Sequence, residues 1–129
     1  MKLMANQSVR IARLGEAHLL AGRADSALSL AERALQLSRE QKERGHEAYA
    51  LRLLGEIWSQ ADASETENAF ARYGQARALV EELAMRPLGV LCNLGLSRLH
   101  RRTGNQQRAE ECLAEGNALA REMDMLLPG

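Results

Sequence analysis

The three histidines and two cysteines of this sequence are its main candidates for a nucleophile, a general base or a metal ligand: His18, His46, His100, Cys92 and Cys112. Catalysis by such a group requires an orienting partner beside it. The two cysteines do not stand at a metal-type spacing, and His46 beside Glu43 and Glu47 offers too few ligands for a zinc site. Buried, inert cysteines are also the common case. We therefore expect no catalytic residue, no metal and no cofactor.

Basic side chains cluster near the end of the chain, at Arg98, His100, Arg101, Arg102 and Arg108. Such a cluster can bind an acidic partner or phosphates, or it can complement the negative end of a helix dipole. The chain as a whole carries 17 Lys and Arg against 17 Asp and Glu, so no basic excess attracts a nucleic acid. Aromatic side chains for base stacking are also few. We favour the helix-end interpretation and expect no nucleic-acid partner.

The sequence has no segment typical of membrane insertion or export. Its apolar runs are far shorter than the roughly 20 residues that span a bilayer. Residues 1–7 become polar too early for a signal peptide. The two cysteines do not make a disulfide framework. We therefore expect a cytoplasmic protein without a membrane partner.

The composition favours helices over strands. Val, Ile and Thr together occur only seven times, whereas Ala and Leu dominate. The length of 129 residues suits one domain with a continuous core. We therefore predict a single all-α domain over residues 1–129.

A leucine followed by a glycine recurs at a fixed interval of 40 residues, ending at Gly15, Gly55 and Gly95. About a dozen residues after each glycine a column of alanines begins a second pattern, at Ala27, Ala69 and Ala109. Small residues also recur seven positions after each of these alanines, and hence on one face of a helix, where they let two backbones approach closely. A glycine inside a helix costs about 1 kcal/mol relative to alanine, so three of them at one place indicate a packing requirement. The pattern predicts three helix hairpins stacked around a shared core.

We predict six helices, at about residues 3–21, 24–43, 46–60, 65–85, 87–102 and 105–124. Three of the breaks between them are marked by a glycine, namely Gly22, Gly45 and Gly104. Ser64 followed by Glu67 has the form of a capping box at the start of the fourth helix. Pro87 suits the first turn of the fifth helix, where no amide donor is needed.

The repeated pattern, a large residue three positions before Leu-Gly and then Ala-x-x-x-large-x-x-Ala, resembles the tetratricopeptide consensus, with Ile11, Leu51 and Leu91 where the family usually has tryptophan. Longer segments at 43–48, 85–88, 99–104 and 121–125 resemble the C-terminal repeat region of large bacterial signalling proteins that carry nucleotide-cyclase or ATPase modules upstream. The resemblance implies a right-handed solenoid in a bacterial cytoplasm, with repeats at about 3–44, 45–85 and 86–125. These repeats of 40 to 42 residues are longer than the family's usual length of about 34.

Solenoids of this family hold other proteins on a concave face lined by the first helix of each hairpin. The resemblance therefore implies a peptide or protein partner, and a scaffold or regulatory adaptor rather than an enzyme. The residues expected in this groove are Arg13, Glu16, Tyr49, Arg52, Glu56, Gln60, Asn93 and His100. The alternative is that Arg13–Glu16 and Arg52–Glu56 are ordinary surface pairs along a helix.

A second hypothesis is self-association through the C-terminal end, where the family usually places a polar capping helix. Apolar side chains gather there instead, at Met123, Met125, Leu126 and Leu127. Exposed apolar surface of this kind tends to be covered by a partner. On this hypothesis the chain forms a homo-oligomer, as a structural piece of a larger signalling protein.

Overall fold

Six α-helices make up the part of the chain that the computed structural model describes, residues 7–126, with side chains described for residues 7–124. They are α1 (Gln7–Leu20), α2 (Ala24–Glu40), α3 (Arg44–Ser59), α4 (Thr66–Leu83), α5 (Arg86–Arg102) and α6 (Gln106–Leu126), with a short 3-10 helix, η2 (Ala63–Glu65), before α4. No strand occurs between residues 7 and 126. The predicted all-α class is confirmed, and each predicted helix overlaps an observed one. None of the described helices is both long and apolar enough to cross a bilayer.

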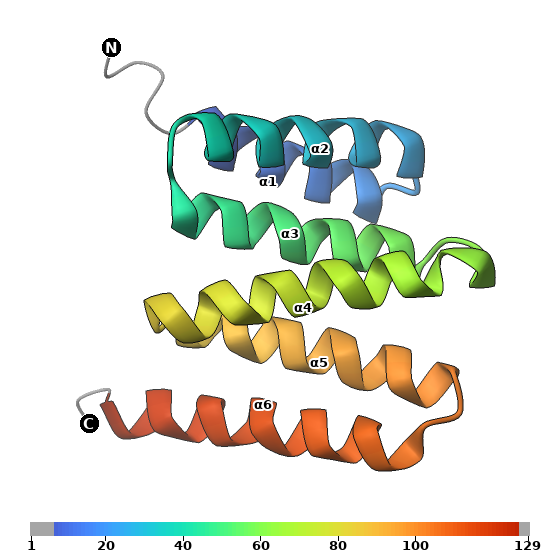
Figure 1. Ribbon diagram of the computed structural model, residues 1–129, viewed down its shortest axis with the longest axis vertical. Coiled ribbons are helices and arrows are strands. Elements are labelled where there is room, and N and C mark those ends of the chain that lie inside the picture. The colour runs from blue at the N-terminus through green and yellow to red at the C-terminus, as the bar shows by residue number, and fades with distance from the viewer. Residues whose placement is uncertain (1–6, 127–129) are drawn as a thin grey trace.

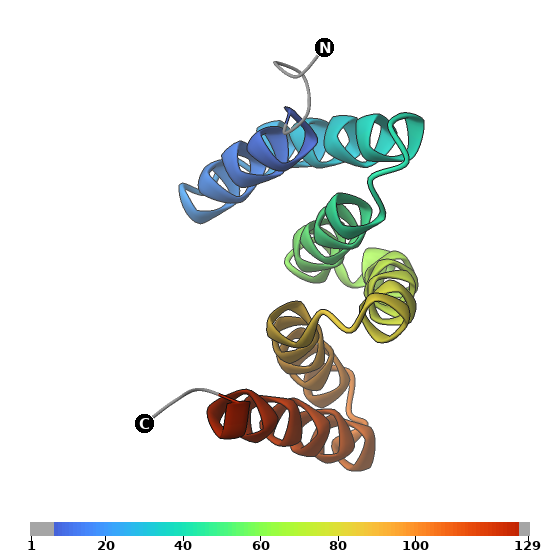
Figure 2. The same ribbon diagram turned by 90° about the vertical axis from the view of Figure 1, so that its left-hand side faces the viewer.

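The helices pack in chain order as three hairpins, α1–α2, α3–α4 and α5–α6 (Figure 1). The hairpins are joined because α2 packs against α3 and α4 against α5. In addition, α3 contacts both α1 and α5. In the view turned by 90°, α3 and α5 lie on one side of the row and α4 on the other (Figure 2). The first helices of the hairpins are therefore neighbours, which brings together residues about 40 positions apart in the sequence.

Helix α3 lies at the centre of the core. Its residues Leu51, Leu53 and Leu54 are each 1% exposed, and Ile57 and Ala50 are buried with them. These positions surround most of the helix because α3 contacts α1, α2, α4 and α5, and a helix with neighbours on all sides needs apolar residues all round. Burial of each leucine stabilises the fold by about 2 kcal/mol.

Two of the three repeated glycines make room for one buried aromatic ring. Tyr73 of α4 is fully buried. A Cβ atom at Gly55 of α3 would lie 2.9 Å from Tyr73 Cγ, and one at Gly95 of α5 would lie 2.6 Å from Tyr73 Cζ and still nearer the hydroxyl. No real Cβ approaches another atom so closely, so the ring fits only because both positions lack a side chain. The predicted packing requirement therefore has a concrete cause at Gly55 and Gly95.

Two predicted helix ends are confirmed at glycines. Gly22 and Gly104 have φ angles of +80° and +90°, in the left-handed region where a Cβ is unfavourable. Each follows the last turn of its helix, with the Gly22 amide donating to the carbonyl of Leu19 at 3.0 Å. Pro87 also lies in the first turn of α5 as predicted.

Two other predicted helix boundaries are wrong. Gly45 lies inside the first turn of α3, and the chain turns earlier at Lys42, which adopts a φ of +57° despite its side chain. Ser64 caps no helix, because it lies within η2 and no side chain accepts a hydrogen bond from the opening amides of α4. The 3-10 turn replaces the capping box as the entry to α4.

Candidate functional site

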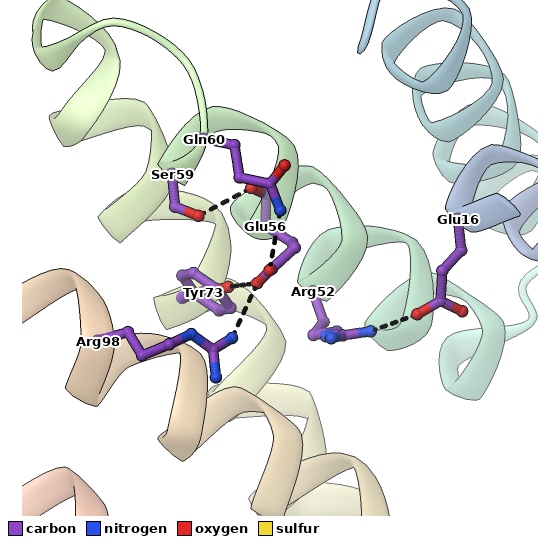
Figure 3. A network of polar contacts seen from close by, with 7 residues as sticks. All are labelled: Glu16, Arg52, Glu56, Ser59, Gln60, Tyr73 and Arg98. Carbon is purple, nitrogen blue, oxygen red and sulfur yellow. Dashed lines mark hydrogen bonds and ion pairs between the residues drawn. The ribbon is translucent and has the colours of Figure 1, made fainter. Parts of the chain in front are cut away.

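A row of charged side chains crosses the first helices of the three hairpins, and we call it the polar row: Glu16 of α1, Arg52 and Glu56 of α3, and Arg98 of α5 (Figure 3). Arg52 Nη1 donates to Glu16 Oε2 at 3.0 Å and so joins α3 to α1. Arg98 Nη2 donates to Glu56 Oε2 at 3.3 Å and so joins α5 to α3. Negative and positive side chains alternate along the row, so each hairpin is linked to the next by an ion pair.

Arg52 is the most enclosed member of the polar row. Only 8% of the residue is exposed, and its Nε is buried without a hydrogen-bond partner among the described residues. A buried donor without an acceptor costs about 1–3 kcal/mol. The guanidinium therefore keeps an unused donor after it has paired with Glu16.

Glu56 is the centre of the polar row. Its Oε2 also accepts a hydrogen bond from the Tyr73 hydroxyl, and its Oε1 accepts one from Gln60 Nε2 at 3.2 Å (Figure 3). Burial disfavours the ionised carboxylate, but the Tyr73 hydroxyl and the charges of Arg98 and Arg52 outweigh it. Together they lower the pKa of Glu56 from its ordinary value of 4.5. Glu56 is thus a fixed anion at neutral pH.

The lowered pKa of Glu56 predicts a loss of stability in acid. Because the folded pKa lies below the unfolded value, the carboxylate stabilises the fold above pH 4.5, and this stabilisation is lost as the pH falls through the folded pKa. We expect the free energy of unfolding, measured by urea titration between about pH 6 and pH 3, to fall more steeply in the wild-type chain than in Glu56→Gln. Equal slopes in the two proteins would contradict this role for Glu56.

The structure brings some of the expected groove residues together and separates others. Arg52 pairs with Glu16, and Glu56 accepts a hydrogen bond from Gln60. The two pairs are not joined by a hydrogen bond or ion pair among the described residues, but the charge of Arg52 contributes to the lowered pKa of Glu56. Arg13 is exposed on α1 and makes no hydrogen bond or ion pair within the described part of the chain.

The remaining three expected groove residues lie elsewhere. Tyr49 is half-buried against the core around α3. Asn93 is 3% exposed and faces α4 and α6. The ring of His100 packs against Phe70 of α4, with ring centroids 4.6 Å apart. These three side chains do not join the polar row.

Two side chains of this network, Arg98 and Tyr73, were not among the expected groove residues. Arg98 was interpreted as a cation at the end of a helix, but it lies inside α5 and pairs with Glu56 of the preceding hairpin. Tyr73 lies four residues after Ala69 and three before Ala76, and both alanines are fully buried. An aromatic residue between two small ones on the buried face of a helix is a signal that could have marked it.

A second cluster of chemically active types joins α1 to the start of α3. The Ser8 hydroxyl donates to Glu43 Oε1 at 3.0 Å and lies 3.0 Å from His46 Nδ1, while His46 Nδ1 lies 3.4 Å from Glu43 Oε1. In a catalytic triad the histidine uses one ring nitrogen for the serine and the other for the acid. Here one nitrogen meets both groups, and Ser8 is only 1% exposed. The geometry is that of a structural hydrogen-bond cluster rather than a triad.

Both thiols are buried. Burial raises the pKa of Cys92 to about 11 and also raises that of Cys112. The reactive form of cysteine is the thiolate, so neither side chain is activated at neutral pH. The described residues contain no group of three or more His, Cys, Asp or Glu side chains arranged to hold a metal ion.

Most of the residues of the self-association hypothesis lie where side chains are not described. Met123 is half-buried on α6. The side chains of Met125 and Leu126, and all of Leu127, lie outside the described residues. Self-association through this end therefore stays a prediction, which the solution mass measured by light scattering over a range of concentrations would test.

No protein-family model matches this chain, and a search of curated proteins finds no match.

Proposed function

We propose that this chain is a protein-interaction module of three tetratricopeptide-like hairpins. Three features support this architecture. The hairpins follow one another in chain order, glycines recur 40 residues apart, and two of these glycines lie at close approaches between helices. The first helices of successive hairpins are neighbours and carry the polar row. In a solenoid of this kind the face of the first helices is the binding surface.

The observation that carries this function is the polar row. Its side chains are held in place before any partner arrives, because Arg52 is buried and Glu56 is fixed by Tyr73 and Arg98. Preordered side chains reduce the entropy that binding must overcome. Donors also remain accessible to a partner, since the Arg98 side chain is 59% exposed.

The partner we propose is an extended protein segment with at least one acidic side chain. A carboxylate can replace or share the contact of Arg98 with Glu56, because a guanidinium has five donors and can serve two acceptors. Backbone carbonyl groups of the same segment can accept from the remaining donors of Arg98. Such a module acts as a scaffold or adaptor, and the resemblance to bacterial signalling proteins suggests the cytoplasm as its place of action.

A displayed library of random peptides tests this function. We expect selection to yield peptides with an acidic residue, and their titration into isotope-labelled protein to shift amide signals of α1, α3 and α5. Arg98→Glu should weaken binding about tenfold, because it replaces a charge-assisted contact by repulsion. The control is Arg33→Glu, at an exposed position of α2 without an ion pair among the described residues. Peptides that map to α2, α4 and α6, or an equal loss in both variants, would refute the proposal.

A further inference from the structure

A pocket of about 390 Å³ opens between the second half of α4, the start of α5 and the second half of α6. Its apolar wall is formed by Val80, Met85, Ala118 and Leu119. Two ion pairs border it. Arg77 Nη2 lies 2.6 Å from Glu115 Oε2, and Arg86 Nε lies 3.1 Å from Glu122 Oε2. The size falls within the range of about 300–1,000 Å³ that small-molecule sites occupy.

Asn93 of α5 lines this pocket and carries an unused acceptor. Its Nδ2 donates to the carbonyl of Gly89 at 3.0 Å, one turn earlier in the helix. Its Oδ1 is buried and has no hydrogen-bond partner among the described residues, although the residue is only 3% exposed. Buried acceptors are paired in the great majority of cases. An unpaired acceptor on a residue that lines a pocket can be satisfied by a donor from a bound molecule.

The preceding repeat shows that the fold does not need an amide at this place. Forty residues before Asn93 stands Leu53, which is 1% exposed and packs in the core around α3. The third repeat therefore has a polar side chain where the second has a leucine. Asn93 makes the core less apolar, and its side-chain carbonyl accepts no hydrogen bond from the described residues.

We propose that this pocket binds a small, largely apolar molecule that carries one N–H or O–H donor for Asn93 Oδ1. The rim excludes an anion, because the positive charges of Arg77 and Arg86 are already paired with Glu115 and Glu122. A further acid on the rim, Glu81, has no ion-pair partner among the described residues. The ligand is therefore uncharged or weakly cationic.

The pocket and the polar row are separate sites on the same helix. Asn93 and Arg98 both belong to α5, but five residues place their side chains about 140° apart around its axis. The pocket faces α4 and α6, whereas Arg98 faces Glu56 of α3. Binding in the pocket does not require the proposed peptide function, and either can fail alone.

The test compares indole with 1-methylindole, two flat probes of similar shape of which only the first carries an N–H donor. Each is titrated into isotope-labelled full-length chain and followed by its effect on amide and side-chain NMR signals. We expect saturable shifts at residues of α4, α5 and α6 that line the pocket, and about tenfold tighter binding of indole. The Asn93 side-chain amide signal should shift with indole.

Asn93→Leu is the decisive variant. It restores the residue type of the second repeat, so the ratio of the affinities for indole and 1-methylindole should fall to about one. The melting temperature should also rise by roughly 3–8 °C, because the unpaired acceptor is removed. Asn93→Ala serves the same purpose if the leucine variant does not fold. The matched control, Asn117→Leu, lies on the exposed side of α6 and should leave the preference unchanged. Equal affinity for both probes, no saturable shift, or a preference that persists without Asn93 would overturn the proposal.

Discussion

Gly95→Ala is expected to destabilise the protein by about 3 kcal/mol, because its new methyl group would overlap the ring of Tyr73. The added Cβ would lie 2.6 Å from Cζ and 2.8 Å from Cε1 of a side chain that is fully buried. Tyr73 cannot move aside easily, since Gly55 already lies against the other part of its ring. Urea titration monitored by circular dichroism would measure the loss.

Two further variants separate this clash from other effects of removing a glycine. Gly74→Ala changes the residue next to Tyr73, where a Cβ meets nothing within 4 Å, and should raise stability by about 0.5–1 kcal/mol. Tyr73→Leu shortens the clashing side chain, so the double variant Gly95→Ala/Tyr73→Leu should lose less stability than the sum of the two single changes. If Gly95→Ala is as stable as the wild type, α4 and α5 do not approach each other as closely as the structure shows.

Glu56→Ala is expected to cost about 2–3 kcal/mol, mainly because it leaves the Tyr73 hydroxyl buried without an acceptor. Tyr73 is 0% exposed, so its hydroxyl has no contact with solvent in the wild-type chain. Tyr73→Phe should therefore cost less in the Glu56→Ala background than alone. A double-mutant cycle should give a coupling of about 1.5–3 kcal/mol, as for hydrogen bonds to charged groups. Thermal and urea unfolding of the four proteins would measure it.

Glu122→Ala is the matched control for the loss of a carboxylate. Glu122 pairs with Arg86, but both side chains are about half-exposed, at 55% and 43%. Exposed ion pairs contribute little, so this change should stay within about 0.5 kcal/mol of the wild type. A coupling near zero between Glu56 and Tyr73, or an equal cost for both glutamates, would show that the carboxylate of Glu56 is solvated like any surface group.

Local chemistry was sufficient to predict the helices. Low β-branched content, alanine columns and turn glycines predicted six helices, and Gly22 and Gly104 adopt the left-handed conformation that such turns need. The errors at Gly45 and Ser64 have a different origin. Lys42 accepts a left-handed backbone that its residue type disfavours, and a 3-10 turn without a buried residue precedes α4 in place of a capping side chain.

The candidate site was predictable only in part. Arg52 and Glu56 could be identified because they lie one turn apart on one helix, and helical spacing is a property of the sequence. Their actual partners, Glu16 and Arg98, belong to neighbouring hairpins and depend on how far each hairpin is shifted along the next. Asn93 was expected in the groove, yet it faces the opposite neighbours. The side of α5 that faces α3 carries Arg98, about 140° around the helix axis from Asn93. The sequence pattern gives the spacing of residues along a helix but not which side of the helix meets which neighbour.

The position of Tyr73 between α3 and α5 bears on how such a chain can change in evolution. Repeat proteins usually gain or lose units by duplication and deletion, because each unit contacts only the next through similar surfaces. Here one ring belongs to the second hairpin, yet it occupies space left by a glycine of the third. A copy of the third hairpin placed after the first would meet Ala31 at the position equivalent to Tyr73, and Gly95 would then face an unfilled space. The second and third hairpins are therefore inherited most readily as a pair, and shuffling of single units would have to be accompanied by compensating changes at Tyr73 and Gly95.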